Sequence, residues 1–349
     1  MLSKSITTRL QNQPNLLSLW ENERGSLRIA GTERGEGSVL TNLIFGGAGF
    51  IGSNLVRALQ TQGQSVVVFD NMQMGNQLSG LDVPQIAADM ADSDAVLRVI
   101  KDVRPSRIFH LAANSDISAS SLDPIFDLDN TLLTTVALSN ALRHVDLRPE
   151  LMFASSSAVY GEHHNAMNES TLRKPVSSYG WMKLASERIL ESLTKDGFVA
   201  NCLIARFPNV TGLNQTHGVV YDLVRKLKSN PHELSVLGDG SQLKPYALAS
   251  ELVENILRVF NQPNKAFSVY NFSPHNTVTV REIVTEIIAA SGLNPEVVYG
   301  SEPVGWAGDI NRYELDCSSV ELDHGPLLFS NSEEAVKVSA RWAWDYLEA

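Results

Sequence analysis

Two short segments of the chain carry side chains suited to proton transfer. Tyr179 and Lys183 are four residues apart in a stretch with a helical pattern, so both side chains lie on one helical face. A lysine ammonium close to a phenol favours the phenolate and lowers its pKa from about 10. Ser156, in a run of three serines that ends an apolar strand, could hold a substrate oxygen and pass on its proton. The three residues predict a tyrosine general base usable near neutral pH.

Each segment alone has a simpler interpretation. A tyrosine and a lysine at helical spacing are usually a surface pair, and serines after a strand usually form a polar loop. The catalytic interpretation depends on the order of the elements: a glycine turn, an acidic residue after the second strand, the serine strand end and then the tyrosine–lysine helix. All of these lie at the carboxyl ends of predicted strands, where open α/β sheets bind ligands.

A glycine-rich turn precedes both segments. An apolar strand at 43–45 is followed by Gly46, Gly49 and Gly52, and a helical pattern then runs over 51–62. Gly46 permits a tight turn, Gly49 lets the backbone approach a pyrophosphate, and Gly52 lets the helix pack close to the strand. Backbone N–H groups and the helix dipole then face the phosphates, so the turn predicts a dinucleotide site.

An acidic residue at the end of the next strand indicates which dinucleotide binds. Asp70 follows the apolar strand at 65–69 and lies 18 residues beyond Gly52. A carboxylate there accepts hydrogen bonds from the adenosine ribose and repels a 2′-phosphate. No arginine follows within several residues, so we expect NAD rather than NADP. The simpler alternative is a turn residue, because Asp70-Asn71 is good turn chemistry.

Two further strand ends could also contact a cofactor. Ala112 and Ala113 would let the backbone pass close to it, although two alanines could equally pack a strand end. Asp89 and Met90 follow another predicted strand, where an adenine ring would lie.

Size and composition narrow the class of protein. With 349 residues, 43% of them hydrophobic, the chain can bury a sizeable core and form two domains. A net charge of −11 argues against a nucleic-acid partner. The two cysteines, Cys202 and Cys317, provide neither a disulfide scaffold nor a metal cluster. No run approaches membrane-spanning length and residues 1–38 lack a continuous apolar stretch, so we expect a cytoplasmic protein that contacts no membrane.

Strand and helix patterns alternate from residue 41 onward. Strands are expected at 43–45, 65–69, 84–87, 107–111, 150–155 and 201–206, and helices at 51–62, 92–103, 124–144 and 179–196. This alternation predicts an α/β fold with a Rossmann-type doubly wound parallel sheet. Beyond about residue 207 the pattern loosens, with helical segments near 218–229, 249–261 and 279–291. We therefore expect a flexible extension at 1–40, an NAD-binding domain at 41–207 and a smaller, mainly substrate-binding lobe at 208–349.

The motifs together resemble the extended short-chain dehydrogenase/reductases that act on nucleotide sugars, the NAD-dependent epimerase/dehydratase family, and most of all its UDP-glucose 4-epimerase group. The resemblance covers about residues 41–345. It also includes Asp70-Asn71 with Gly75-Asn76, Asp129-Asn130-Thr131, and the runs at 205–212, 237–242 and 305–309. It implies a tightly held NAD, a nucleotide-sugar substrate, no metal, and a homodimer formed through the helices at 124–144 and 179–196.

The resemblance also assigns roles to individual residues. Ser156 matches the catalytic hydroxyl, Tyr179 the base, and Lys183 the lysine that also grips the nicotinamide ribose. The implied cofactor contacts are Gly46, Gly49, Phe50, Ile51, Gly52, Asp70, Asn71, Asp89, Met90, Leu111, Ala112, Ala113, Asn130, Tyr179, Lys183 and Phe207. The implied substrate contacts are Ser156, Asn209 at the diphosphate, Lys244 in place of a diphosphate-binding arginine, and Tyr313 at the wall of the sugar pocket.

Three departures from the family pattern affect the expected specificity. Pro208 replaces the usual residue before Asn209, and Trp306 stands where a second phosphate-binding arginine is common. A lysine at 244 cannot make the bidentate fork of arginine. Ser157 and Ala158 occupy positions where dehydratases and decarboxylases carry acidic residues, which disfavours elimination and decarboxylation.

The resemblance therefore implies inversion at C4 of a nucleotide-linked hexose through a transient 4-keto sugar. Two alternatives stay open. One is a reductase or another net oxidoreductase or dehydratase of the same family. The other is a non-catalytic NAD-binding regulatory protein, although such relatives usually lose the tyrosine or the lysine. Tyr313 indicates a preference for unmodified hexoses, unless it faces solvent or the core instead.

Overall fold

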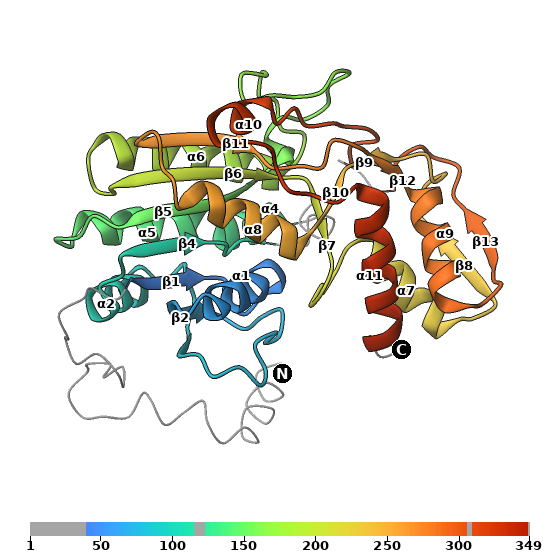
Figure 1. Cartoon of the computed structure of the whole chain (residues 1–349), viewed down its shortest axis with the longest axis horizontal. Coiled ribbons are helices and arrows are strands. Elements are labelled where there is room, and N and C mark those ends of the chain that lie inside the picture. Colours follow the sequence, from blue (N-terminus) through green and yellow to red (C-terminus); the bar gives the residue numbers. More distant parts are fainter. Residues whose placement is uncertain (1–39, 115–122, 306–308, 348–349) are drawn as a thin grey trace.

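The computed structural model describes residues 40–114, 123–305 and 309–347. The expected extension at 1–40 lies outside these residues except for Leu40, and so does Trp306. In Figure 1 a large sheet with its helices fills the left of the view, and a smaller lobe lies on the right. None of the helices in the described ranges is long and apolar enough to span a membrane.

The large sheet has seven parallel strands in the order β11-β6-β5-β4-β1-β2-β3. These strands are β1 (Thr41–Phe45), β2 (Ser65–Asp70), β3 (Gln85–Ala87), β4 (Arg107–His110), β5 (Glu150–Ser156), β6 (Asn201–Phe207) and β11 (Phe267–Asn271). The strand order reverses between β1 and β4, which opens a crevice at the carboxyl ends of the strands. The predicted doubly wound parallel sheet is confirmed.

Helices cover both faces of this sheet because its strands are apolar on both sides. Alternate residues of β1 point to opposite faces: Ile44 packs with α1 (Phe50–Thr61) and α8 (Ala249–Phe260), whereas Leu43 and Phe45 belong to the core on the other face. That second core includes α2 (Ser93–Val103), α5 (Leu133–Arg143) and α6 (Ser178–Lys195).

The helix expected at 124–144 is not continuous. It begins as α4 (Pro124–Asp127), capped by the Asp123 carboxylate, and passes through a π-helical turn (Leu128–Leu132) before continuing as α5. Such turns are uncommon and often occur at functional sites. This one lies beside the crevice, because Phe126 and Asn130 both line its cavity.

The smaller lobe has a core of its own. Apolar residues of α7 (Val219–Ser229), α9 (Val280–Ser291) and α11 (Ser332–Tyr346) pack together with the parallel pair β8 (Glu233–Val236) and β13 (Glu296–Tyr299). Two short pairs link the lobe to the sheet: β7 (Asn209–Thr211) with β10 (Tyr246–Leu248), and β9 (Leu243–Lys244) with β12 (Val278–Thr279).

The expected boundary at residue 207 does not coincide with the end of the large sheet. Both α8 and β11 lie beyond it, yet α8 packs on α1 and β11 pairs with β6. The remaining helix, α10 (Ser318–His324), contacts β11. The chain therefore passes from the sheet to the lobe and back, so the lobe is not one continuous piece of sequence.

Candidate active site

A cavity of about 680 Å³ lies between the carboxyl ends of the sheet and the smaller lobe. All twenty residues expected to bind cofactor or substrate, or to act on it, line this cavity. They come from seven regions: the glycine turn, the ends of the strands β2 to β6 with the helices that follow β4 and β5, and the C-terminal lobe. The fold therefore brings the expected residues to one place.

Gly46, Gly49 and Gly52 form a concave turn, here called the glycine cradle, that side chains at these positions would fill or distort. Gly46 has a φ of +77°, and a Cβ added there would lie 2.6 Å from the Ala112 nitrogen. A Cβ on Gly52 would lie 2.1 Å from the Gly46 carbonyl oxygen. Gly52 therefore lets the helix pack close to the turn, and not to the strand that the sequence predicts. Gly49 is the N-cap of α1 and lines the cavity, and a Cβ there would lie 3.5 Å from the Gly46 carbonyl oxygen. The first N–H groups of the helix are therefore at the cavity, where an anion could bind.

Asp70 is joined to the same cradle. Its Oδ2 accepts a hydrogen bond from the Ala48 nitrogen at 2.9 Å, and its Oδ1 accepts one from the Met72 nitrogen at 2.8 Å. Burial raises the pKa of this carboxyl, while these backbone hydrogen bonds oppose the rise. Both interpretations of Asp70 are therefore compatible with the geometry, since it stabilises a turn and also lines the cavity. The glycine cradle and this carboxylate together fit an adenine dinucleotide without a 2′-phosphate.

Ser156 and Tyr179 meet although they are far apart in sequence. Strand β5 ends at Ser156, whose hydroxyl accepts a hydrogen bond from the Ala158 nitrogen at 3.1 Å and whose side chain lies close enough to Tyr179 to act on the pKa of its hydroxyl. Helix α6 begins one residue before Tyr179 and is capped by the Ser177 hydroxyl. A Cβ on Gly180 would lie 2.6 Å from the Ala158 carbonyl oxygen, so this glycine lets α6 sit directly on the turn after β5.

The expected lowering of the tyrosine pKa is wrong for this arrangement. Burial raises the pKa of Tyr179 well above its ordinary value, and the hydrogen bond from Ser156 only partly offsets this. Burial also lowers the pKa of Lys183 to about 7, since the side chain is only 2% exposed. Lys183 Nζ donates to the Ala154 carbonyl at 2.7 Å and lies 5.6 Å from the centroid of the Tyr179 ring. Desolvation is the largest cause of both shifts, and spacing along a helix cannot reveal how deeply each group is buried.

Tyr313 lines the cavity in the lobe and is 6% exposed. Its hydroxyl accepts a hydrogen bond from the Asn209 nitrogen at 3.0 Å and also hydrogen-bonds Ser157. Burial raises the pKa of Tyr313 to about 12, so the hydroxyl is neutral and can donate. The side chain does not face solvent, and it connects the turn after β5 to β7.

Lys244 is not a free cation. Its Nζ forms an ion pair with Asp309 Oδ1 at 2.5 Å, and both side chains are largely buried. The other oxygen of Asp309 accepts from the Gly305 nitrogen at 3.3 Å. A contact between Lys244 and a diphosphate stays a prediction, and such a contact would have to share the lysine with Asp309.

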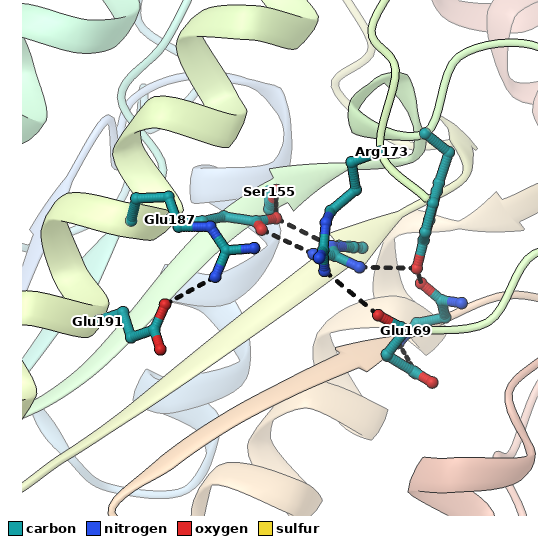
Figure 2. A network of polar contacts seen from close by, with 9 residues as sticks. Ser155, Glu169, Arg173, Glu187 and Glu191 are labelled. Carbon is teal, nitrogen blue, oxygen red and sulfur yellow. Dashed lines mark hydrogen bonds and ion pairs between the residues drawn. The ribbon is translucent and has the colours of Figure 1, made fainter. Parts of the chain in front are cut away.

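A buried polar network lies behind the catalytic residues (Figure 2). Arg206 donates to both Glu187 oxygens at 2.9 and 2.7 Å, and Ser155 donates to Glu187 at 2.5 Å. Arg206 also donates to the Tyr160 hydroxyl, which donates in turn to Asn271 on β11. The network thus ties α6, one turn beyond Lys183, to three neighbouring strands of the sheet.

Several cavity residues were not predicted from the sequence. They are Asn114, Thr134, Gln215, Thr216, His217, Asp222, Lys226, Gln242, Tyr246 and Asp309. Asn114 directly follows the Leu111–Ala113 turn, and Asp309 ends a run noted for its family resemblance, so both had a local signal. Gln242 ends another of those runs. The others are polar residues between β7 and α7, on α7, on β10 or on α5, and no motif marked them. No group of three metal-ligating side chains occurs in the described parts of the chain.

Comparisons with known proteins agree with this geometry. The model of the NAD dependent epimerase/dehydratase family matches residues 42–272. A putative UDP-glucose 4-epimerase of Methanocaldococcus jannaschii is 27% identical over 286 residues, which cover 80% of this chain and 90% of that protein. A crystal structure of a UDP-galactose 4-epimerase is 29% identical with a TM-score of 0.79, and covers 88% of this chain and 100% of its own. The structure of MoeE5 in complex with UDP-glucuronic acid and NAD is 27% identical with a TM-score of 0.78, and it too covers 88% of this chain and 100% of its own. This chain belongs to the NAD dependent epimerase/dehydratase family.

Proposed function

We propose that this protein inverts C4 of a nucleotide-linked hexose of the UDP-glucose and UDP-galactose type, through a transient 4-keto sugar. The observation that carries the proposal is that Ser156, Tyr179 and Lys183 together line a cavity that extends from the glycine cradle into the lobe. NAD, held by the cradle and Asp70, accepts and returns the C4 hydride when bound. The named activities of the relatives support the same reaction.

Each catalytic side chain has one task in this reaction. Tyr179 takes the proton of the C4 hydroxyl in its phenolate form, which its raised pKa makes scarce near neutral pH, and gives the proton back after the sugar has turned over. Ser156 holds the C4 oxygen and relays the proton, since it lines the cavity beside Tyr179. Lys183, anchored on the Ala154 carbonyl, supplies positive charge beside the phenol as the proton leaves. The lobe binds the nucleotide, which leaves the sugar free to rotate.

The residues that follow Ser156 favour epimerisation over elimination. Elimination of water needs an additional acid and base close to the reacting carbons. Ser157 is hydrogen-bonded to Tyr313, and Ala158 has no ionisable group. The carboxylates that line the cavity, Asp70, Asp89, Asp222 and Asp309, come from other elements.

The purified protein, with its own bound dinucleotide, should be incubated with a panel of nucleotide sugars. Epimerisation leaves the mass of the sugar nucleotide unchanged, alters its chromatographic retention and consumes no added NADH. Loss of one water would identify a dehydratase, and stoichiometric loss of NADH would identify a reductase. If none of the sugar nucleotides is converted although NAD is bound, the non-catalytic alternative is favoured.

The dinucleotide released when the purified protein is denatured should be NAD.

Tyr313 is expected to make the enzyme prefer unmodified hexoses over their N-acetyl forms. A bulky ring at the cavity wall leaves little room for a 2-acetamido group when the sugar turns, and overfilling a packed cavity costs about 1–3 kcal/mol. Tyr313→Ser should therefore raise kcat/KM for UDP-N-acetylgalactosamine relative to UDP-galactose. Tyr313→Phe is the matched control, because it removes the hydrogen bonds to Asn209 and Ser157 but keeps the ring. An unchanged ratio in Tyr313→Ser, or a wild-type preference for the acetylated sugar, would show that Tyr313 is not the gate.

We also propose a homodimer formed through α5 and α6. Leu133 and Val136 on α5 and Trp181 on α6 are exposed apolar side chains, and the two helices pack side by side. Val136→Glu should convert the dimer to a monomer, because it buries a charge in the proposed interface. Val338→Glu on α11, at a similarly exposed valine, is the control that should leave the mass unchanged. Light scattering measures the molecular mass of both variants, and a wild-type monomer would contradict the proposal.

A cytoplasmic location of the protein stays a prediction.

A further inference from the structure

Two successive hydrogen bonds join helix α6 to the end of β5. Lys183 Nζ donates to the Ala154 carbonyl at 2.7 Å, and the Ser155 hydroxyl donates to Glu187 Oε1 at 2.5 Å. The two strand residues are neighbours, and the two helix residues are one turn apart on the same face of α6. The bonds therefore fix where the end of the strand lies along the helix.

The catalytic side chains are the next positions on both elements. Ser156 directly follows Ser155 at the end of β5, and Tyr179 is one turn before Lys183 on the same face of α6. Both side chains line the cavity. If α6 slid along the strand end, the hydroxyls of Ser156 and Tyr179 would move relative to each other and to any substrate oxygen between them.

The acceptor of the Ser155 hydrogen bond is itself held in place (Figure 2). Arg206 donates through Nε and Nη2 to the two oxygens of Glu187 at 2.9 and 2.7 Å, and through Nη1 to the Tyr160 hydroxyl at 2.8 Å. Only 3% of the Glu187 side chain and 1% of the Arg206 side chain are exposed. A bidentate pair of this kind has one geometry, so Glu187 presents its Oε1 to Ser155 in a fixed position.

Stability alone does not account for a charged pair at this place. Apolar side chains of similar volume can often replace a buried ion pair without loss of stability. Such side chains would also hold α6 against the sheet, but hydrophobic contact has no direction and would let the helix slide. Hydrogen bonds weaken steeply when their angles change, so the bond from Ser155 to Glu187 specifies one register of α6 on β5.

We propose that Ser155 and Glu187 are positioning residues for the epimerisation proposed above, on which this inference rests: their hydrogen bond holds Ser156 and Tyr179 in register around one sugar hydroxyl. Ser155 lines the cavity, but its hydroxyl proton is given to Glu187, and Glu187 does not line the cavity. Both residues therefore act through their neighbours. A displacement of about 1 Å at a reacting group can lower the rate roughly a hundredfold.

The variant that tests this is Ser155→Ala, which removes the hydrogen bond and keeps the pair of Arg206 and Glu187. We expect kcat to fall about ten- to a hundredfold because the proton relay is out of register. KM for the nucleotide sugar, the content of bound NAD and the denaturation midpoint should stay close to those of the wild type. Ser155→Thr keeps the hydroxyl and should recover most of kcat.

Ser186→Ala is the matched control on the same helix. Ser186 is fully buried, and its hydroxyl has no hydrogen-bond partner in the ranges that the structure describes, so its loss should leave kcat unchanged. The proposal is overturned if Ser155→Ala keeps the kcat of Ser186→Ala, or if Ser155→Thr recovers no activity. Loss of bound NAD from Ser155→Ala would instead assign Ser155 to the cofactor site.

Amide hydrogen exchange of the NAD-bound protein tests the register without a substrate. Exchange in peptides that cover the end of β5 and the first turn of α6 should be faster in Ser155→Ala than in Ser186→Ala, because the strand end is released from the helix. If the sugars react but Ser155→Ala changes neither exchange nor kcat, the proposed function stands and the positioning role fails. If exchange becomes faster but no nucleotide sugar is converted by the wild type, Ser155 does set the register and the proposed function fails.

Discussion

Replacement of Tyr179 by phenylalanine should abolish turnover while the fold and the bound NAD remain. The substitution removes only the hydroxyl, and the ring keeps its place beside Lys183. Loss of a positioned general base lowers kcat by about two to four orders of magnitude. The comparison requires turnover of the preferred sugar, the dinucleotide content after denaturation, and circular dichroism of both proteins.

Two serine variants are expected to lose less turnover than Tyr179→Phe. Ser156→Ala should cost less than Tyr179→Phe, because the hydroxyl relays a proton that Tyr179 can still accept. Ser157→Ala should cost less again, since Ser157 bonds Tyr313 rather than the base. Activity of Tyr179→Phe close to that of the wild type would exclude the mechanism.

The largest effect on stability is expected from Glu187→Ala. This change leaves Arg206 buried, with 1% of its side chain exposed, and without the two hydrogen bonds that compensate its charge. Removal of one partner of a buried ion pair typically costs about 3–5 kcal/mol of unfolding free energy. Denaturant unfolding of the NAD-bound protein, followed by circular dichroism, would measure the loss.

Glu191 offers a matched control one turn further along the same helix (Figure 2). It pairs with Arg188 at 2.7 Å and with Lys195 at 2.8 Å, and both cations are more than half exposed. Exposed pairs of this kind contribute about 0–1 kcal/mol, so Glu191→Ala should change the unfolding free energy little. If Glu187→Ala destabilises no more than Glu191→Ala, the network of Figure 2 does not hold the sheet and α6 together.

The parts of the fold that sequence could predict are those with a strong local signal. The first six strands of the sheet and their connecting helices follow from apolar runs of the right length, and the glycine turn is recognisable because Gly46 and Gly52 tolerate no side chain. Strand β11 was missed. It lies at the edge of the sheet with its first three residues half-buried, so Phe267–Asn271 shows no continuous apolar run.

The electrostatics of the site could not be predicted in the same way. Tyr179 and Lys183 are correctly placed on one helical face, but the direction of the tyrosine pKa depends on how deeply both are buried. The bond of Lys244 to Asp309 joins residues 65 positions apart, and the bond of Asn114 to Asp127 joins the turn after β4 to α4. These interactions exist only once distant elements have packed, and no local pattern encodes them.

The passage of the chain between sheet and lobe also constrains how the protein is made. The core of the lobe combines Leu223 of α7, Ile283 of α9 and Ala340 of α11, so it is incomplete until the last helix has left the ribosome. The large sheet is complete once β11 has emerged, well before α11. During synthesis the growing chain can therefore close its dinucleotide-binding half first, and it exposes the apolar faces of α7 and α9 until α11 has emerged.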